Sequence, residues 1–118
     1  MRTYKIFVHV KNSTAEEVTR TLTNKFHART CHDGTLLISD ERRENRDAAE
    51  IEIDCALGWV FVLAYLPYGD SWEEWRDLIW RTLTNELHHA MDIEVQDNHD
   101  NIIYEAERPA VSAEKSVA

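Results

Sequence analysis

Three side chains that commonly bind metal ions lie close together in the first third of the chain. His27 is expected on the last turn of a helix, and Cys31 and His32 in the loop that follows it. Imidazole and thiolate groups are ligands that zinc prefers. No further cysteine or carboxylate stands at a recognised ligand spacing, so we expect no metal, and these three residues remain only weak candidates for one.

Carboxylates that crowd one helical turn are a second group able to do acid-base chemistry. Glu73, Glu74 and Asp77 form this group, but Asp77 lies four residues before Arg81, so a surface ion pair explains its position. The chain has three glycines and no GxSxG, P-loop, GxGxxG or HExxH motif. We therefore expect a non-enzymatic protein without a cofactor. A metal-assisted hydrolase or a small-molecule-binding domain is the alternative.

A third pattern is a row of carboxylates along an expected strand. Glu50, Glu52 and Asp54 alternate with Ile51 and Ile53, so the acids point to one face and the isoleucines to the other. Acids at every second residue lie about 6.8 Å apart, because a strand rises about 3.4 Å per residue. Such a row would attract a basic partner. The alternative is that the charges protect an edge strand from aggregation.

The acidic residues are concentrated in the second half of the chain. Residues 1–46 carry a net charge of +3, residues 47–107 carry −13 and residues 108–118 carry +1, which gives −9 for the chain. Negative charge repels a phosphate backbone, so the expected partner is a basic protein surface, for example that of a nucleic-acid-binding protein, and not nucleic acid itself. Solubility alone is the competing explanation.

The predicted partner-binding surface combines these acids with two tryptophans at the start of a helix. Tryptophan is enriched at binding hot spots, although core packing is its more common role. The predicted residues are Glu50, Glu52, Asp54, Asp92, Glu94, Asp97, Asp100, Glu105, Trp72 and Trp75.

A buried strand and a long helix must position these groups. In residues 59–66, Trp59, Phe61, Leu63 and Tyr65 alternate with aliphatic side chains, so neither face is polar and the strand is expected near the centre of a sheet. Ser71 and Glu74 have the spacing of a capping box, which starts a helix that reaches residue 91. Its apolar stripe consists of Trp72, Trp75, Ile79, Leu83, Leu87 and Ala90.

The other elements follow from the same periodicities. A first helix begins at residues 12–14 and is closed by His27 and Arg29. Residues 40–47 form a charged loop or a short helix. Strands are expected at residues 3–10, 35–39, 49–54, 92–96 and 102–107.

A short internal repeat suggests how these elements are arranged. Residues 20–24 and 81–85 both read RTLTN, and each is followed by a histidine. Two strand-helix-strand-strand halves predict an α+β fold, an antiparallel sheet with both helices on one face. A duplicated βαββ sheet of this kind is similar in topology to ferredoxin-like or gyrase-inhibitor-like proteins, which implies no activity.

The chain is expected to form one domain over residues 1–108, with a flexible tail over residues 109–118. Two cysteines far apart and no CxxC motif indicate free thiols in a reducing cytoplasm. The functional prediction is a small acidic cytoplasmic binding protein that occupies a basic site on another macromolecule, as inhibitors, immunity proteins and phage anti-defence proteins do. A second alternative is a structural subunit that forms a homodimer through Phe7, Trp59, Phe61 and Tyr65.

Overall fold

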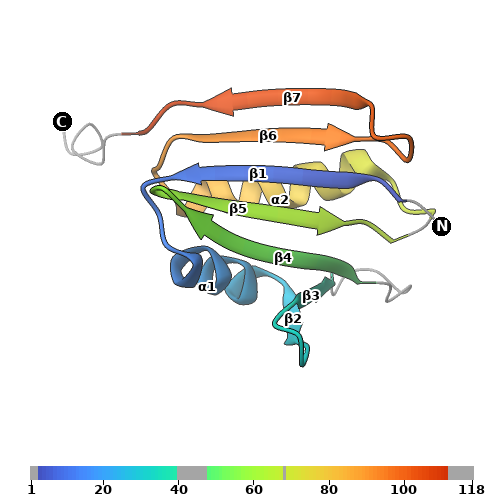
Figure 1. The fold of residues 1–118 in the computed structure, drawn as a ribbon, viewed down its shortest axis with the longest axis horizontal. Helices are drawn as coiled ribbons and strands as arrows, with labels where there is room; N and C mark the ends of the chain where they lie inside the picture. The colour runs from blue at the N-terminus through green and yellow to red at the C-terminus, as the bar shows by residue number, and fades with distance from the viewer. Residues whose placement is uncertain (1–2, 40–47, 68, 112–118) are drawn as a thin grey trace.

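The described residues form one seven-stranded antiparallel sheet with two helices, which confirms the predicted α+β class (Figure 1). A computed structural model describes residues 3–39, 48–67 and 69–111. The helices are α1 (Ala15–Lys25) and α2 (Trp72–Glu86). The strands are β1 (Lys5–Lys11), β2 (His27–Thr30), β3 (Leu36–Ser39), β4 (Ala49–Ala56), β5 (Trp59–Tyr65), β6 (Met91–Gln96) and β7 (Ile102–Arg108). Their order across the sheet is β2-β3-β4-β5-β1-β6-β7.

The middle of the sheet is formed by β5 and β1. β5 lies between β4 and β1, which confirms that the strand with no polar face is central. β1 lies between β5 and β6, and both neighbours run antiparallel to it. The side chains of Ile6, Val8 and Val10 are fully buried on one face of β1. The first strand of the chain is therefore an interior strand of the sheet.

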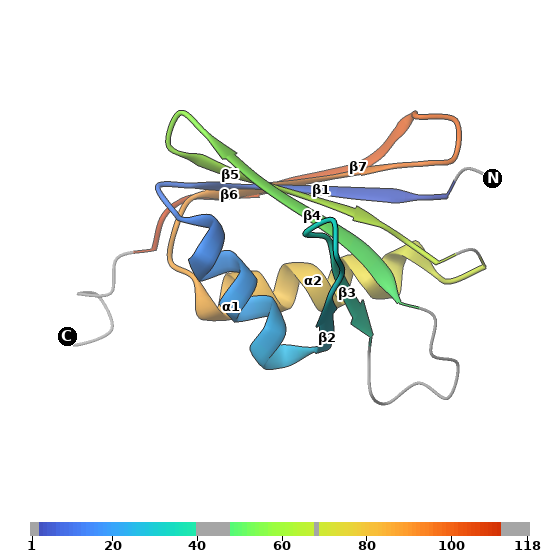
Figure 2. The ribbon, with the colours of Figure 1, turned by 60° about the horizontal axis from the view of Figure 1, so that its bottom comes forward.

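Both helices cover the same face of the sheet, as predicted (Figure 2). α2 runs behind β1 and β5 in Figure 1, and α1 lies beside β4. Trp75, Ile79 and Leu83 point from α2 into the core. Among the described residues, no helix covers the opposite face, which we call the open face.

The N-cap hydrogen bond that a capping box predicts is present at both helix starts. The Thr14 hydroxyl accepts a hydrogen bond from the Glu17 backbone N–H, and Ser71 accepts one from that of Glu74. α2 ends at Glu86, earlier than predicted. The Arg108 guanidinium donates to backbone carbonyls at that end, so a side chain from β7 takes the place of further helical turns.

The predicted end of the first helix is wrong. α1 ends at Lys25, and residues 27–30 form the edge strand β2. Phe26 is buried and its ring stacks on that of Trp75 with centroids 6.4 Å apart, which turns the chain into the core. β2 then pairs with β3 through a turn at Asp33-Gly34, so sheet hydrogen bonds replace the last helical turn.

The structure does not confirm the duplicated βαββ topology. The strand after α1 lies at the edge of the sheet, whereas the strand after α2 lies inside it, beside β1. The first half also contains an additional strand, β2, which was not predicted. The two RTLTN segments lie in α1 and α2, so the repeat is a similarity between helices.

Two further predictions fall partly or wholly outside the described residues. The charged segment 40–47 lies outside them, as do residues 112–118 of the predicted tail. Of the tail residues that are described, Val111 donates its backbone N–H to the carbonyl of His88 over 2.8 Å. No helix in the described ranges is both long and apolar enough to cross a bilayer.

The turn between β4 and β5 holds a leucine in an unfavourable conformation. Leu57 has φ = 54° and is fully exposed, and Gly58 follows with φ = 82°. A two-residue turn of this type favours asparagine at its first position. We expect Leu57→Asn to raise the free energy of unfolding by about 0.5–1 kcal/mol in urea denaturation, because asparagine tolerates positive φ better than leucine. Leu57→Ala is the control: alanine keeps the conformational cost, so its free energy of unfolding should stay near that of wild type. An increase for alanine equal to that for asparagine would contradict this explanation.

Candidate functional site

The open face carries a central apolar strip. It consists of Phe7 from β1 with Trp59, Phe61, Leu63 and Tyr65 from β5. Phe7 lies directly opposite Leu63, and the ring of Phe61 is 38% exposed. Their neighbours along each strand point to the helices, because successive side chains alternate between faces. Among the described residues no second layer covers the aromatic face of β5, although only Phe61 is exposed and the other strip residues are half-buried.

One side of the strip is bounded by the acids of β4. Glu50, Glu52 and Asp54 face the same side of the sheet as the strip, and all three are exposed. Across the β4–β5 pair they lie opposite Tyr65, Leu63 and Phe61. We call these three residues the β4 row. β3 pairs only with Ala49, Glu50 and Ile51 of β4, so Glu52 and Asp54 lie on a stretch with no described neighbouring strand on that side, where charges also protect a sheet edge.

The other side is bounded by acids of β6 and β7. Glu94 lies directly opposite Glu105, and Asp92 lies directly opposite Glu107. We call these four residues the β6–β7 group. Like charges that face each other across two strands destabilise a sheet, so this arrangement costs stability. Glu94 accepts a hydrogen bond from the Gln96 amide over 2.8 Å, which orients its carboxylate.

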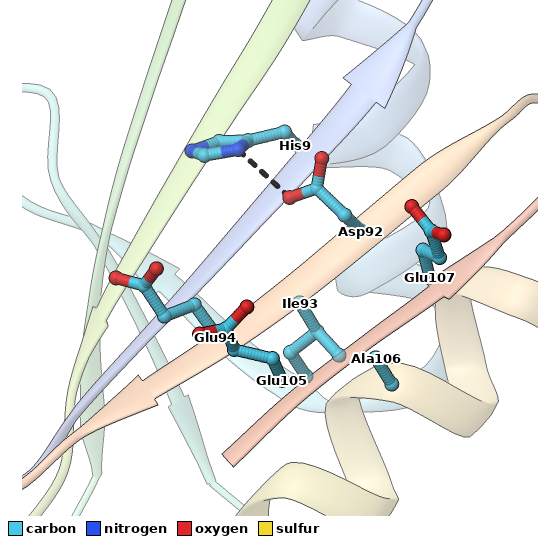
Figure 3. Close-up of a pocket in the computed structure, with 7 residues that line it drawn as sticks. All are labelled: His9, Asp92, Ile93, Glu94, Glu105, Ala106 and Glu107. Carbon is cyan, nitrogen blue, oxygen red and sulfur yellow. Dashed lines mark ion pairs between the residues drawn. The ribbon is translucent and has the colours of Figure 1, made fainter. Parts of the chain in front are cut away.

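A shallow hollow of about 540 Å³ lies over the β6–β7 group (Figure 3). His9 stands at its edge with Nδ1 2.8 Å from Asp92 Oδ1, and its ring meets that of Phe61 edge to face at 5.2 Å. His9 therefore joins the apolar strip to the acids. The hollow is lined by His9, Asp92, Ile93, Glu94, Glu105, Ala106 and Glu107.

Few cations neutralise these acids. Lys5 on β1 pairs with Asp100 over 2.6 Å, and Lys25 pairs with Glu86 over 3.0 Å. Lys11 lies 5.9 Å from the ring centre of Trp59. Among the described residues, no ion pair involves the β4 row or either glutamate of β7. The negative charge of the open face thus forms two bands on either side of the strip, and not one continuous patch.

The two acids of the β6–β7 turn have other roles. Asp97 accepts hydrogen bonds from the backbone N–H groups of Asn101 and His99, and the bond from Asn101 contributes most to lowering the pKa of Asp97 below its usual value. Asp97 therefore shapes the turn. Asp100 has φ = 64° and forms the ion pair with Lys5. Neither residue belongs to the β4 row or the β6–β7 group.

The two predicted tryptophans lie on the helix side of the sheet. Trp75 is fully buried, so it cannot contact a partner in this fold, and its assignment to the binding surface is wrong. Trp72 is half-buried between Tyr4 and Tyr104, with the Arg76 guanidinium 5.3 Å from its ring. The same periodicity that placed both tryptophans in the helix stripe indicates core packing.

The three weak candidates for metal ligands lie in and after β2. His27 is the first residue of β2 and Cys31 follows its last residue, so the backbone positions of these two residues are about 13 Å apart, because a strand rises about 3.3 Å per residue. Cys31 and His32 lie in the turn that follows. Across the part of the chain that the structure describes, no three His, Cys, Asp or Glu side chains are placed to hold a metal ion.

Sequence reasoning missed His9. The two-residue spacing placed His9 on the same face of β1 as Phe7, but the chain gives no local signal that β6, more than 80 residues later, would be its neighbour. Glu107 is one of the acids of the second half of the chain, and its position opposite Asp92 depends on the β6–β7 register.

Comparison of the chain with known proteins gives no family model, no curated protein and no solved structure that matches it. The open face is therefore the candidate functional surface. This face offers apolar area in the middle and carboxylates on both sides, which complements a surface that is apolar in the middle and basic on both sides.

Proposed function

We propose that the protein is a non-enzymatic binding protein that occupies a basic site on another macromolecule through its open face. Inhibitors and immunity proteins work in this way. Both described cysteines are free thiols, which supports action in the reducing cytoplasm.

The observation that carries this proposal is the pair of facing carboxylates across β6 and β7. Glu94 opposite Glu105, and Asp92 opposite Glu107, repel each other in the free protein. A bound cationic group would relieve this repulsion. The arrangement thus reduces the stability of the free protein while favouring a positively charged partner.

The same charges count against a homodimer through the open face. In any face-to-face arrangement, an acidic band of one copy would lie over an acidic band of the other, because the acids flank the strip on both sides. Like-charge contacts of this kind cost several kcal/mol. A basic partner meets no such penalty.

The test uses fluorescein-labelled deca-lysine as the probe at low ionic strength. In Glu105→Lys/Glu107→Lys each facing pair becomes attractive, so we expect the free energy of unfolding to rise by about 0.5–1 kcal/mol. The affinity for deca-lysine, measured by fluorescence anisotropy, should fall at least tenfold. Higher stability with weaker binding cannot result from misfolding.

The matched control is Glu73→Lys/Asp77→Lys, which makes the same charge change on the helix side. Its affinity should stay within threefold of wild type. Equal losses in both variants would mean that net charge alone governs binding, which would contradict the assignment to the open face.

A further inference from the structure

We propose that the partner element that docks on the open face is an amphipathic α-helix with lysine or arginine along both flanks, lying over the apolar strip. This inference rests on the proposed function and specifies its ligand. It follows from the width of the site, the spacing of the acids and the position of the strip between them.

The width of the site matches a helix. Neighbouring strands lie about 4.8 Å apart, so β4 and β6, which are separated by β5 and β1, are about 14 Å apart. A helix with its side chains is about 10–12 Å across. A helix over β5 and β1 would therefore have the β4 row on one side and the β6–β7 group on the other, both within reach of a long basic side chain.

The spacing along the site also suits a helix. Glu50, Glu52 and Asp54 recur about every 6.8 Å along β4. Residues four apart on a helix are about 6 Å apart along its axis, so basic residues at i, i+4 and i+8 would face the three acids. The apolar stripe of such a helix would cover Phe7, Phe61 and Leu63.

An extended strand fits less well. A strand lying on the face directs only alternate side chains toward it, in one line, and so cannot reach acids on both sides of the strip. A strand that adds to the sheet would bind at its edges, β2 or β7, away from the strip.

The test compares two synthetic probes of identical composition, each with seven leucines and seven lysines. One has helical periodicity with lysines on both flanks, and the other has leucine and lysine in alternation, which favours a strand. We expect the helical peptide to bind at least tenfold more tightly by fluorescence anisotropy. Circular dichroism should show that its helix content rises on binding.

Three variants test where the helical peptide lies. Phe61→Thr keeps a strand-forming residue. It should lower the affinity for the helical peptide at least fivefold and leave the affinity for deca-lysine within twofold of wild type, because only the helical peptide contacts the apolar strip. Glu50→Lys/Glu52→Lys and Glu105→Lys/Glu107→Lys should each weaken it, since the helix needs acids on both sides. The unfolding midpoint of each variant is measured to show that it folds.

The outcomes separate this inference from the proposed function. Equal affinities for the helical and alternating peptides would contradict a helical docking element but would still agree with a basic ligand. The same holds if the acids on only one side of the strip affect binding. If neither these peptides nor deca-lysine bound to the wild-type protein, both proposals would be overturned.

Discussion

Replacing Trp75 with alanine is expected to lower the free energy of unfolding by about 3–5 kcal/mol, the largest effect of any single substitution proposed for this protein. The side chain is fully buried, and its ring stacks on Phe26 between the two helices. Its indole N–H also donates to Asp70 over 2.9 Å, a bond that joins α2 to the preceding loop. Truncation would leave a cavity in the core and remove this hydrogen bond. Urea denaturation monitored by circular dichroism would measure the loss.

The matched control is Trp72→Ala, three residues earlier on the same helix. Trp72 is half-buried, so its truncation should cost roughly half as much. A larger cost for Trp72 than for Trp75 would mean that the first turn of α2, and not its middle, anchors the helix to the sheet. That result would contradict the core described above.

Replacing Arg108 with methionine is expected to lower the free energy of unfolding by about 2–3 kcal/mol. The guanidinium donates to the carbonyl oxygens of Thr84 over 2.8 Å and Leu87 over 2.7 Å, and also to that of His89. It thereby ties β7 to the end of α2 and satisfies carbonyls that the helix leaves free. Methionine would keep much of the packing and remove all of these hydrogen bonds.

The cost of Arg108→Met should not change between pH 5 and 9. Burial lowers the pKa of Arg108 below its ordinary value, but arginine stays charged in both the folded and unfolded states over this range. Arg108→Lys is the second variant, and we expect it to recover less than half of the loss, because one ammonium cannot reproduce the planar fork. Full recovery by lysine would show that charge alone matters. Denaturant midpoints across this range provide the measurement.

The regular elements could be predicted where the hydrophobic period is strong. Residues 59–65 and the stripe through Ile79 and Leu83 have unambiguous patterns, and both elements lie where the sequence places them. The end of α1 could not be predicted, because it depends on the contact between Phe26 and Trp75 and on the pairing of β2 with β3. The RTLTN repeat suggested a duplicated sheet, but strand order depends on pairings that a helical motif does not encode.

On the open face too, the local sequence pattern could be predicted and the pairing of the strands could not. Alternation correctly assigns Glu50, Glu52 and Asp54 to one side of a strand, and it does the same for the acids of β6. Which strands are neighbours, and therefore which acids face each other, is decided by backbone pairing between distant segments. The two bands of charge and the strip between them appear only once that register is known.

The interior position of β1 has a consequence for how the protein is made. Lys5–Lys11 leaves the ribosome well before its neighbours, which begin at Trp59 and Met91. The nascent chain must therefore hold an apolar strand without its partners until β5 and β6 have been synthesised, and these non-local pairings make folding slow. We expect β1 to be the segment of the nascent chain that most needs protection from aggregation.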